Sequence, residues 1–208
     1  IRTAVVPRSQ GDEEKIGGAL HVIAAEDPSF HFDFDPELAQ LIISGQGELQ
    51  LNILLERLKE RFGVEVDQEE PKIPYRETIK GTSETQGKHK KQSGGRGQYG
   101  DCWLKLEKLP RGGDFEFVDA IVGGVIPGKF IPAVEKGVKG AITEGVVAGF
   151  PVVDVKVTCF DGSSHNVDSS ENAFRMAGAK GFRAGFVKAK PVILEPIYNV
   201  EIRVPEEY

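Results

Sequence analysis

The sequence has few of the residues that usually mark a metal site, a disulfide framework or a membrane segment. It contains two cysteines, Cys102 and Cys159, which lie far apart and outside any CxxC pattern, and four scattered histidines. No stretch approaches the roughly 18 consecutive apolar residues of a transmembrane helix, and the first residues lack the apolar centre of a signal peptide. These absences argue against disulfides, structural zinc and a membrane span, and they favour a reducing, cytoplasmic location.

What is present is typical of a globular chain with room for two domains. The chain has 208 residues, of which 39% are hydrophobic and 28% are charged, so it can bury a core without cross-links. The charge is uneven, because residues 1–78 hold 8 Lys and Arg against 16 Asp and Glu, whereas residues 80–100 hold five basic residues against Glu84 alone. A basic segment on an acidic body indicates docking on a phosphate-rich partner, or else a solvated run of charge.

Residues 1–75 have the pattern of a β-α-β-β-α-β domain. We expect strands at 2–6, 30–35, 41–43 and 64–67, and helices at 10–25 and 48–62. Apolar and polar residues alternate over 30–35, which is typical of a half-buried strand, and Gly63 stands where a helix ends. This order predicts a ferredoxin-like α+β fold, and Pro71 and Pro74 mark a boundary near residue 75.

Residues 76–208 differ from the first 75 in composition and pattern. They contain an extended basic segment, a glycine-rich loop and further expected strands and helices. We expect strands at 102–106, 115–120, 152–159, 191–194 and 197–204, and helices at 130–147 and from Ser169 onward. Asp161 and Gly162 are expected to form a turn. Asp168 is expected to be the N-cap of the last helix, with Glu171 completing a capping box.

Two glycine motifs match nucleotide-binding patterns by their letters alone. GRGQYG at 95–100 matches GxGxxG, but the residues after it alternate as a strand, whereas a dinucleotide site needs a helix there. GGVIPGKF at 123–130 matches GxxxxGK, but it places Phe130 where Mg²⁺ needs a Ser or Thr hydroxyl. We therefore expect neither motif to bind nucleotide phosphates, and no nucleophile–base pair or metal cluster indicates catalysis.

The segment from Lys88 to Tyr99 has chemistry suited to RNA. Lysines neutralise phosphates, glycine amides approach a backbone closely, and Arg96 and Tyr99 can stack on bases. The alternative is a charged edge strand whose lysines prevent pairing with another sheet. A second polar loop, residues 161–166, is rich in short hydrogen-bonding side chains, and its chemistry alone favours an ordinary turn before a capped helix.

Together the motifs resemble one family along nearly the whole chain. They are similar to the third and fourth domains of translation elongation factor G, the ribosomal translocase, followed by the opening strand of its fifth domain. The matching stretches, in the family's order, are ISGQGEL at 43–49, YRET at 75–78, QSGGRGQYG at 92–100, GGVIP at 123–127, GFPVV at 149–153, VDSSE at 167–171 and PVILEP at 191–196.

The resemblance implies a fold for each part of the chain. It implies a ferredoxin-like domain for residues 1–75 and, for residues 76–192, the fold of the second domain of ribosomal protein S5 with a left-handed βαβ crossover. Residues 193–208 are then the opening strand of a truncated following domain. The resemblance also implies that the parent is a ribosome-dependent GTPase that binds GTP and Mg²⁺ in a separate first domain. This fragment is then not an enzyme and has no cofactor, catalytic residue or metal of its own.

The resemblance also implies a function for a tip formed by two loops. In the family, the fourth domain reaches the decoding region of the small ribosomal subunit and keeps tRNA and mRNA moving together. His165 matches the position of the family's tip histidine. We expect a monomer that contacts the ribosome and the tRNA–mRNA helix but no membrane. The residues expected to bind RNA or the ribosome are Lys88, His89, Lys90, Lys91, Ser93, Gly94, Gly95, Arg96, Gln98, Tyr99, Ser163, Ser164, His165 and Asn166.

The sequence also departs from the usual family pattern at three places. Residues 88–91 are more basic than the matching stretch of the family, Gln50 replaces a frequent histidine, and Asn166 replaces a frequent acidic residue. These differences resemble those of a divergent second paralogue and leave open an arm specialised for ribosome recycling. An alternative of another class is a generic RNA-binding module that acts without nucleotide switching.

Overall fold

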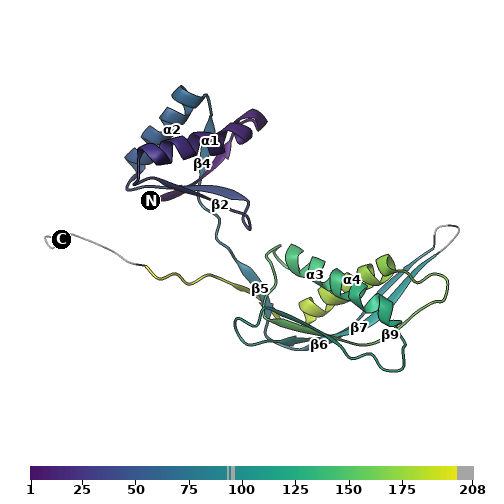
Figure 1. Cartoon of the computed structure of the whole chain (residues 1–208). Coiled ribbons are helices and arrows are strands. Elements are labelled where there is room, and N and C mark those ends of the chain that lie inside the picture. Colours follow the sequence, from purple (N-terminus) through teal and green to yellow (C-terminus); the bar gives the residue numbers. More distant parts are fainter. Residues whose placement is uncertain (93, 95–96, 201–208) are drawn as a thin grey trace. The chain divides into compact units, whose positions relative to one another are not determined.

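The computed structural model describes residues 1–92, 94 and 97–200 of the chain (Figure 1). The chain divides into two compact units, Ile1–Ile73 and Pro74–Tyr208. Each has a hydrophobic core of its own, and we call them the first and second units. No helix within the described residues is long and apolar enough to cross a membrane.

The first unit combines a four-stranded antiparallel sheet with two helices. The strand order in the sheet is β2-β3-β1-β4, and the chain order is β1-α1-β2-β3-α2-β4. The elements are β1 Arg2–Pro7, α1 Gln10–Glu26, β2 His31–Asp35, β3 Gln40–Ser44, α2 Glu48–Phe62 and β4 Val66–Glu69. The ferredoxin-like βαββαβ fold predicted from the sequence is therefore confirmed.

Each helix of the first unit buries one face against the sheet. The helical spacing of the apolar residues sets this face, and each fully buried Leu or Ile stabilises the unit by about 1.5–3 kcal/mol. The helix α2 ends at Gly63, whose φ of +65° is a left-handed conformation that glycine adopts without strain. The buried residues are Ile16, Ala19, Leu20 and Ile23 in α1, and Leu51, Leu54 and Leu58 in α2.

The second unit is a mixed sheet of order β6-β7-β9-β8, with a separate antiparallel pair of β10 and β5. Strands β8 and β9 are parallel neighbours joined through α3, which makes a βαβ unit. This α+β architecture is the S5 domain 2-like fold that the resemblance implies. The elements are β5 Arg76–Ile79, β6 Ser83–Lys91, β7 Gln98–Lys108, β8 Phe115–Asp119, α3 Ile131–Glu144, β9 Val155–Ser163, α4 Glu171–Lys188 and β10 Pro191–Leu194.

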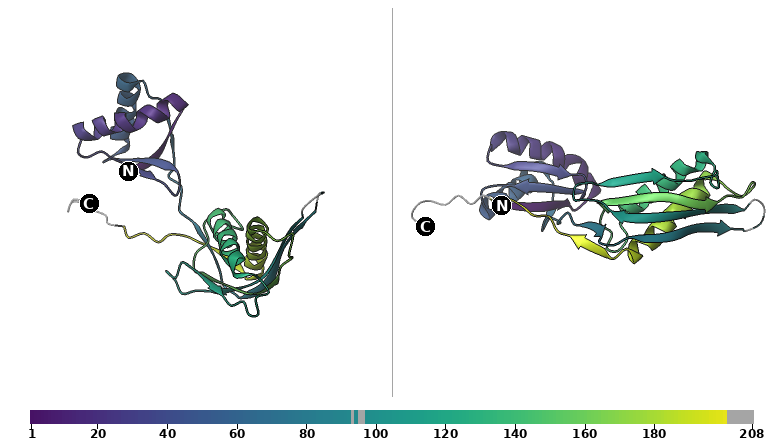
Figure 2. Two further views of the ribbon diagram at one scale, coloured as in Figure 1. Left: turned by 45° about the vertical axis from the view of Figure 1, so that its right-hand side comes forward. Right: turned by 90° about the horizontal axis from the view of Figure 1, so that it is seen from below.

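The helices α3 and α4 lie on the same face of the large sheet (Figure 2). Phe174, Phe182 and Phe186 of α4 are fully buried in the core. A glycine lets β6 approach α4 closely, because a Cβ on Gly87 would lie 2.1 Å from the carbonyl oxygen of Ala177. The sheet and the helix therefore touch backbone to backbone at this point.

The strand β9 begins and ends later than the predicted strand 152–159, because it runs from Val155 to Ser163. Asp161 and Gly162, predicted to form a turn, are strand residues that pair with Trp103 and Cys102 of β7. The register shifts between Trp103 and Leu104, and this irregularity lets pairing continue beyond it. The predicted turn is wrong, because pairing with a strand distant in sequence overrides the local turn preference of Asp-Gly.

The N-cap of α4 is also one that the sequence did not identify. Ser170, not Asp168, is the cap, and its hydroxyl accepts the Ala173 N–H at 3.2 Å. After α4, the strand β10 pairs with β5 and ends at Leu194, and residues 195–200 form no helix or strand. The rest of the predicted opening strand, residues 201–208, lies outside the described residues.

Candidate nucleic-acid interface

Two connections meet at one end of the second unit. One joins β6 to β7, and the other joins β9 to α4. Asp168 links them, because its carboxylate accepts the Gly97 N–H at 3.0 Å and its carbonyl oxygen accepts the Tyr99 N–H at 2.8 Å. We call residues 88–92, 94, 97–99 and 163–169 the tip. The predicted residues Ser93, Gly95 and Arg96 lie outside the described residues.

A buried carboxylate organises the base of the tip. Asp101 of β7 is only 5% exposed. It accepts hydrogen bonds from the Ser163 hydroxyl at 2.7 Å and from the Gln86 amide at 2.8 Å. The Tyr99 hydroxyl lies 2.7 Å from the Ser163 oxygen, so Tyr99 donates to Ser163 when Ser163 donates to Asp101. Ser163 of β9 therefore links its strand to β7 at the base of the tip through its hydroxyl.

His165 lies on the exposed side of this network. Its Nδ1 accepts the backbone N–H groups of Val167 at 3.3 Å and Asp168 at 3.1 Å. Its backbone N–H donates to the Ser169 hydroxyl at 2.9 Å, and its ring lies 6.2 Å from the Tyr99 ring. The neutral imidazole therefore carries its proton on Nε2, and its side chain is 54% exposed.

The strand β6 turns Lys88 and Lys90 to one face and His89 to the other, as the period of a strand requires. Lys88 and Lys90 are exposed, and the Lys88 Nζ lies 5.8 Å from the centre of the Tyr99 ring. His89 is 9% exposed; its Nε2 lies 2.8 Å from the Gln98 Oε1, and its Nδ1 lies 3.3 Å from the Lys180 Nζ. His89 therefore supports the hairpin from within, unlike its lysine neighbours.

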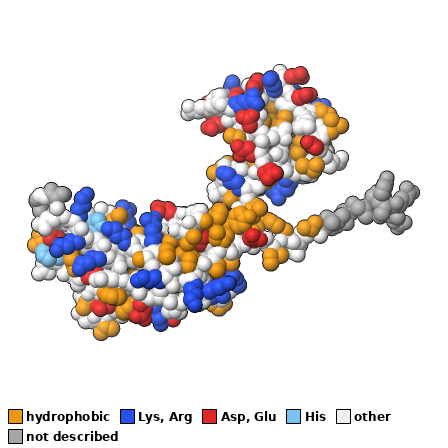
Figure 3. Space-filling model, turned by 180° about the vertical axis from the view of Figure 1, so that it is seen from behind, with side chains coloured by type: hydrophobic (Ala, Val, Ile, Leu, Met, Phe, Trp, Pro, Cys, Tyr) orange, Lys and Arg blue, Asp and Glu red, His pale blue; other side chains and the backbone are white. Residues whose placement is uncertain are grey.

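The remaining predicted residues within the described part of the tip are exposed. They are Lys91, Gly94, Gln98, Ser164 and Asn166. Figure 3 shows basic side chains (blue) and histidine side chains (pale blue) close together at this end of the second unit, and further basic side chains along the rest of the unit. The structure thus brings together on one surface most of the described residues that the sequence singled out, apart from the inward-facing His89 and the partly enclosed Ser163.

A lysine that sequence reasoning did not assign to the tip lies beside it. A pocket of about 270 Å³ is lined by Pro127, Lys129, Phe130, Ser164, His165, Asn166 and Ser169. The GxxxxGK resemblance drew attention to Lys129 only as a nucleotide-binding residue. Phe130 is 8% exposed and stacks on Phe174 with ring centres 4.8 Å apart, so this segment is anchored in the core.

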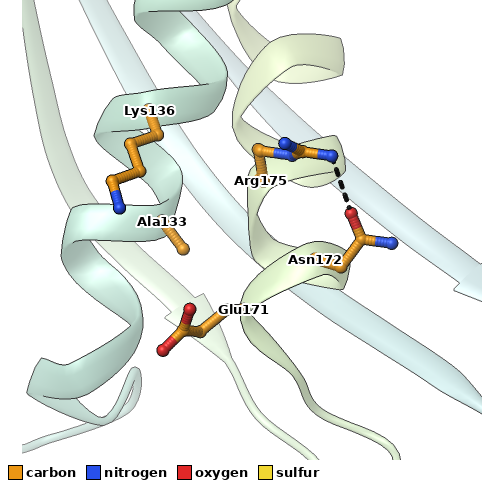
Figure 4. Close-up of a pocket in the computed structure, with 5 residues that line it drawn as sticks. All are labelled: Ala133, Lys136, Glu171, Asn172 and Arg175. Atoms are coloured by element: carbon orange, nitrogen blue, oxygen red, sulfur yellow. Dashed lines mark hydrogen bonds between the residues drawn. The ribbon is translucent and has the colours of Figure 1, made fainter.

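A second pocket, of about 350 Å³, lies between α3 and α4 (Figure 4). Lys136 extends from α3, whereas Glu171, Asn172 and Arg175 extend from α4, and the Arg175 guanidinium donates to the Asn172 Oδ1 at 3.1 Å. Its charges are of both signs, unlike those lining the pocket at the tip. No group of three or more His, Cys, Asp or Glu residues among those described is arranged to hold a metal ion.

Comparisons with known proteins match both units. The protein-family model "Elongation Factor G, domain III" matches residues 1–70, and "Elongation factor G, domain IV" matches residues 71–190. A crystal structure of a protein from Thermus thermophilus is similar at 45% sequence identity, with a TM-score of 0.77. The match covers 93% of this chain and 29% of the Thermus protein, so the chain corresponds to less than a third of that protein's length.

Proposed function

Because the chain belongs to the elongation factor G family, we propose that it is the ribosome-engaging part of a translational GTPase. In this proposal the tip enters the decoding region of the small subunit and promotes movement of tRNA together with mRNA. The observation that carries the proposal is the link through Asp168, which joins the two loops and presents His165 and the β6 lysines on one exposed surface.

The lysines of the tip supply the attraction to RNA. Lys88 and Lys90 share one face of β6 about 7 Å apart, and Lys91 is the last residue of this strand. Each lysine that neutralises a phosphate releases a counterion, so binding to the ribosome weakens as salt rises. This electrostatic attraction does not depend on the base sequence, so it brings the tip to RNA of any sequence.

In this proposal His165 supplies an oriented hydrogen-bond donor. Its Nε2–H is a donor that points away from the two amides bound at Nδ1, and its ring offers a face for stacking. Those amides fix the ring in place, so the donor is already oriented before RNA arrives. The proposed role of His165 is therefore to hold the tRNA–mRNA helix in position as it moves.

GTP binding and hydrolysis belong, in this proposal, to another domain of the longer protein, which binds GTP with Mg²⁺. Two features of this chain support that division. Gln98, Tyr99 and Gly100 of the GRGQYG motif are the first residues of strand β7, so the motif does not open a helix. In the GxxxxGK-like segment, the position after Lys129 must carry a hydroxyl that binds Mg²⁺. This position is occupied by Phe130, whose side chain is buried in the core.

The proposal is tested by His165→Ala in the longer protein that contains this chain. Single-turnover tRNA movement should slow about tenfold, which corresponds to one lost hydrogen bond of about 1.4 kcal/mol. Ribosome-stimulated GTP hydrolysis should stay near normal, because His165 lies outside the domain that hydrolyses GTP. The matched control is Lys108→Ala, an exposed residue at the other end of β7. Equal rates of tRNA movement for the two variants would count against the proposal.

The same variants separate translocation from recycling. The exposed lysine run of β6, more basic than usual for the family, favours recycling as the second candidate. If His165→Ala slows the splitting of ribosomal subunits and leaves tRNA movement unchanged, the parent is a recycling factor. If neither process depends on GTP, the chain is a generic RNA-binding module.

A further inference from the structure

The pocket at the tip joins a third connection to the two already described. Pro127, Lys129 and Phe130 come from the connection between β8 and α3, and the other lining residues come from the connection between β9 and α4. Lys129 is exposed, and its Nζ lies 5.0 Å from the centre of the Phe130 ring. Because that ring is anchored in the core, it provides a fixed surface under the lysine.

The groups that line this pocket are mainly hydrogen-bond donors. The Lys129 ammonium, the His165 Nε2–H, the Ser164 hydroxyl and the Asn166 amide can all donate. None of the lining residues is acidic. The neighbouring Asp168 carboxylate accepts the Gly97 N–H and lies 3.5 Å from the Nδ1 side of the imidazole. A donor-rich pocket without a carboxylate favours an anion.

The positions of the cations indicate a polyanion. Lys88 lies over the Tyr99 ring, the Tyr99 ring lies 6.2 Å from the His165 ring, and His165 shares its pocket with Lys129. The order is therefore cation, ring, ring, cation across the tip. Such an array follows an RNA strand, in which phosphates alternate with stackable bases, better than it fits a single small anion.

We infer that the pocket between residues 127–130 and 164–169 binds one phosphodiester of an RNA backbone, with Lys129 neutralising its charge and His165 donating from Nε2. The inference rests on the proposed function and names a group that the tip contacts. At about 270 Å³, the pocket is smaller than the roughly 300–1,000 Å³ of drug-sized sites. It therefore has room for one phosphate with part of its sugar.

The test is a titration of the ¹⁵N-labelled chain with hexauridylate, followed by amide NMR spectra. The amides of residues 128–130 and 164–166 should shift with saturation. Lys129→Ala should weaken this binding about three- to fivefold and reduce the salt slope by about 0.7, the share of one phosphate on a single strand. Lys129→Arg should restore both, and Lys108→Ala should change neither.

Three outcomes would overturn the inference. One is the absence of saturable shifts at these amides, and another is equal binding by Lys129→Ala and Lys108→Ala. The third is that inorganic phosphate binds the pocket as tightly as hexauridylate, which would make it a site for free phosphate. The amide spectrum of each variant also reports whether it is folded. Since no ribosome is present, failure here leaves the proposed function standing, and failure of the ribosome assay leaves this result standing.

Discussion

A buried carboxylate fixes the loop that follows α3. Glu77 of β5 is 1% exposed. It accepts the backbone N–H groups of Val146, Val147, Ala148 and Phe150 at 2.7–3.3 Å. Burial alone raises the pKa of the Glu77 carboxyl, but the bonds from these four amides outweigh it, and the pKa lies below its usual value. The carboxylate therefore accepts the hydrogen bonds that these backbone N–H groups would otherwise make within a strand or helix.

Glu77→Gln should destabilise the second unit by about 2–3 kcal/mol, because it removes the charge that these amides bind. The folded-state pKa is lowered, so the stabilisation is complete above the unfolded pKa of about 4.3 and is lost as pH falls below it. The urea midpoint of the wild type should thus fall from about pH 5 to about pH 3, and this fall should be smaller in the variant. The control is Glu84→Gln on the exposed face of β6. A variant as stable as this control at pH 7 would contradict the assignment.

At the scale of elements, the start of α4 offers the clearest measurement. Ser170→Ala removes the hydroxyl that accepts the Ala173 N–H and should cost about 1 kcal/mol of stability. Thermal unfolding checks this against Thr82→Ala, an exposed residue between β5 and β6. A loss no larger than that of Thr82→Ala would mean that the cap contributes nothing.

The helices and the fold of the first unit were predictable, because the sequence patterns that indicate them lie within single elements. The spacing of Leu51, Leu54 and Leu58 and the stop at Gly63 lie within one helix and its end. The end of β9 at Ser163 was not predictable, because it depends on pairing with Asp101 of β7, about 60 residues earlier in the chain. The same reason applies to Asp168, whose predicted capping role is replaced by bonds to Gly97 and Tyr99.

Part of the candidate site was predictable for the same reason. The basic run and the polar loop are visible as composition, and the resemblance marks His165. The inward position of His89 depends on Gln98 and Lys180, which come from two other elements. The place of Lys129 beside the tip depends on the path of the chain between β8 and α3, for which the sequence offers no periodic signal.

At the scale of the whole molecule, the two hydrophobic cores share no residue. We therefore expect residues 74–200, expressed alone, to unfold cooperatively in urea at the same midpoint as the second unit of the full chain. The separate piece 1–73 provides the comparison for the first transition. A piece 74–200 without a cooperative transition would show that the second unit depends on the first.

The strand that carries the tip also has a mechanical consequence. The strand β7 has 11 residues, which at about 3.3 Å each extend for about 36 Å. Backbone contact at Gly87 braces β6, the neighbour of β7, against α4, so the structure acts as a stiff lever arm. A tilt of about ten degrees at the base of this arm sweeps its end through about 6 Å. The second unit can in this way convert a small rotation at its base into a displacement of several ångströms at the tip.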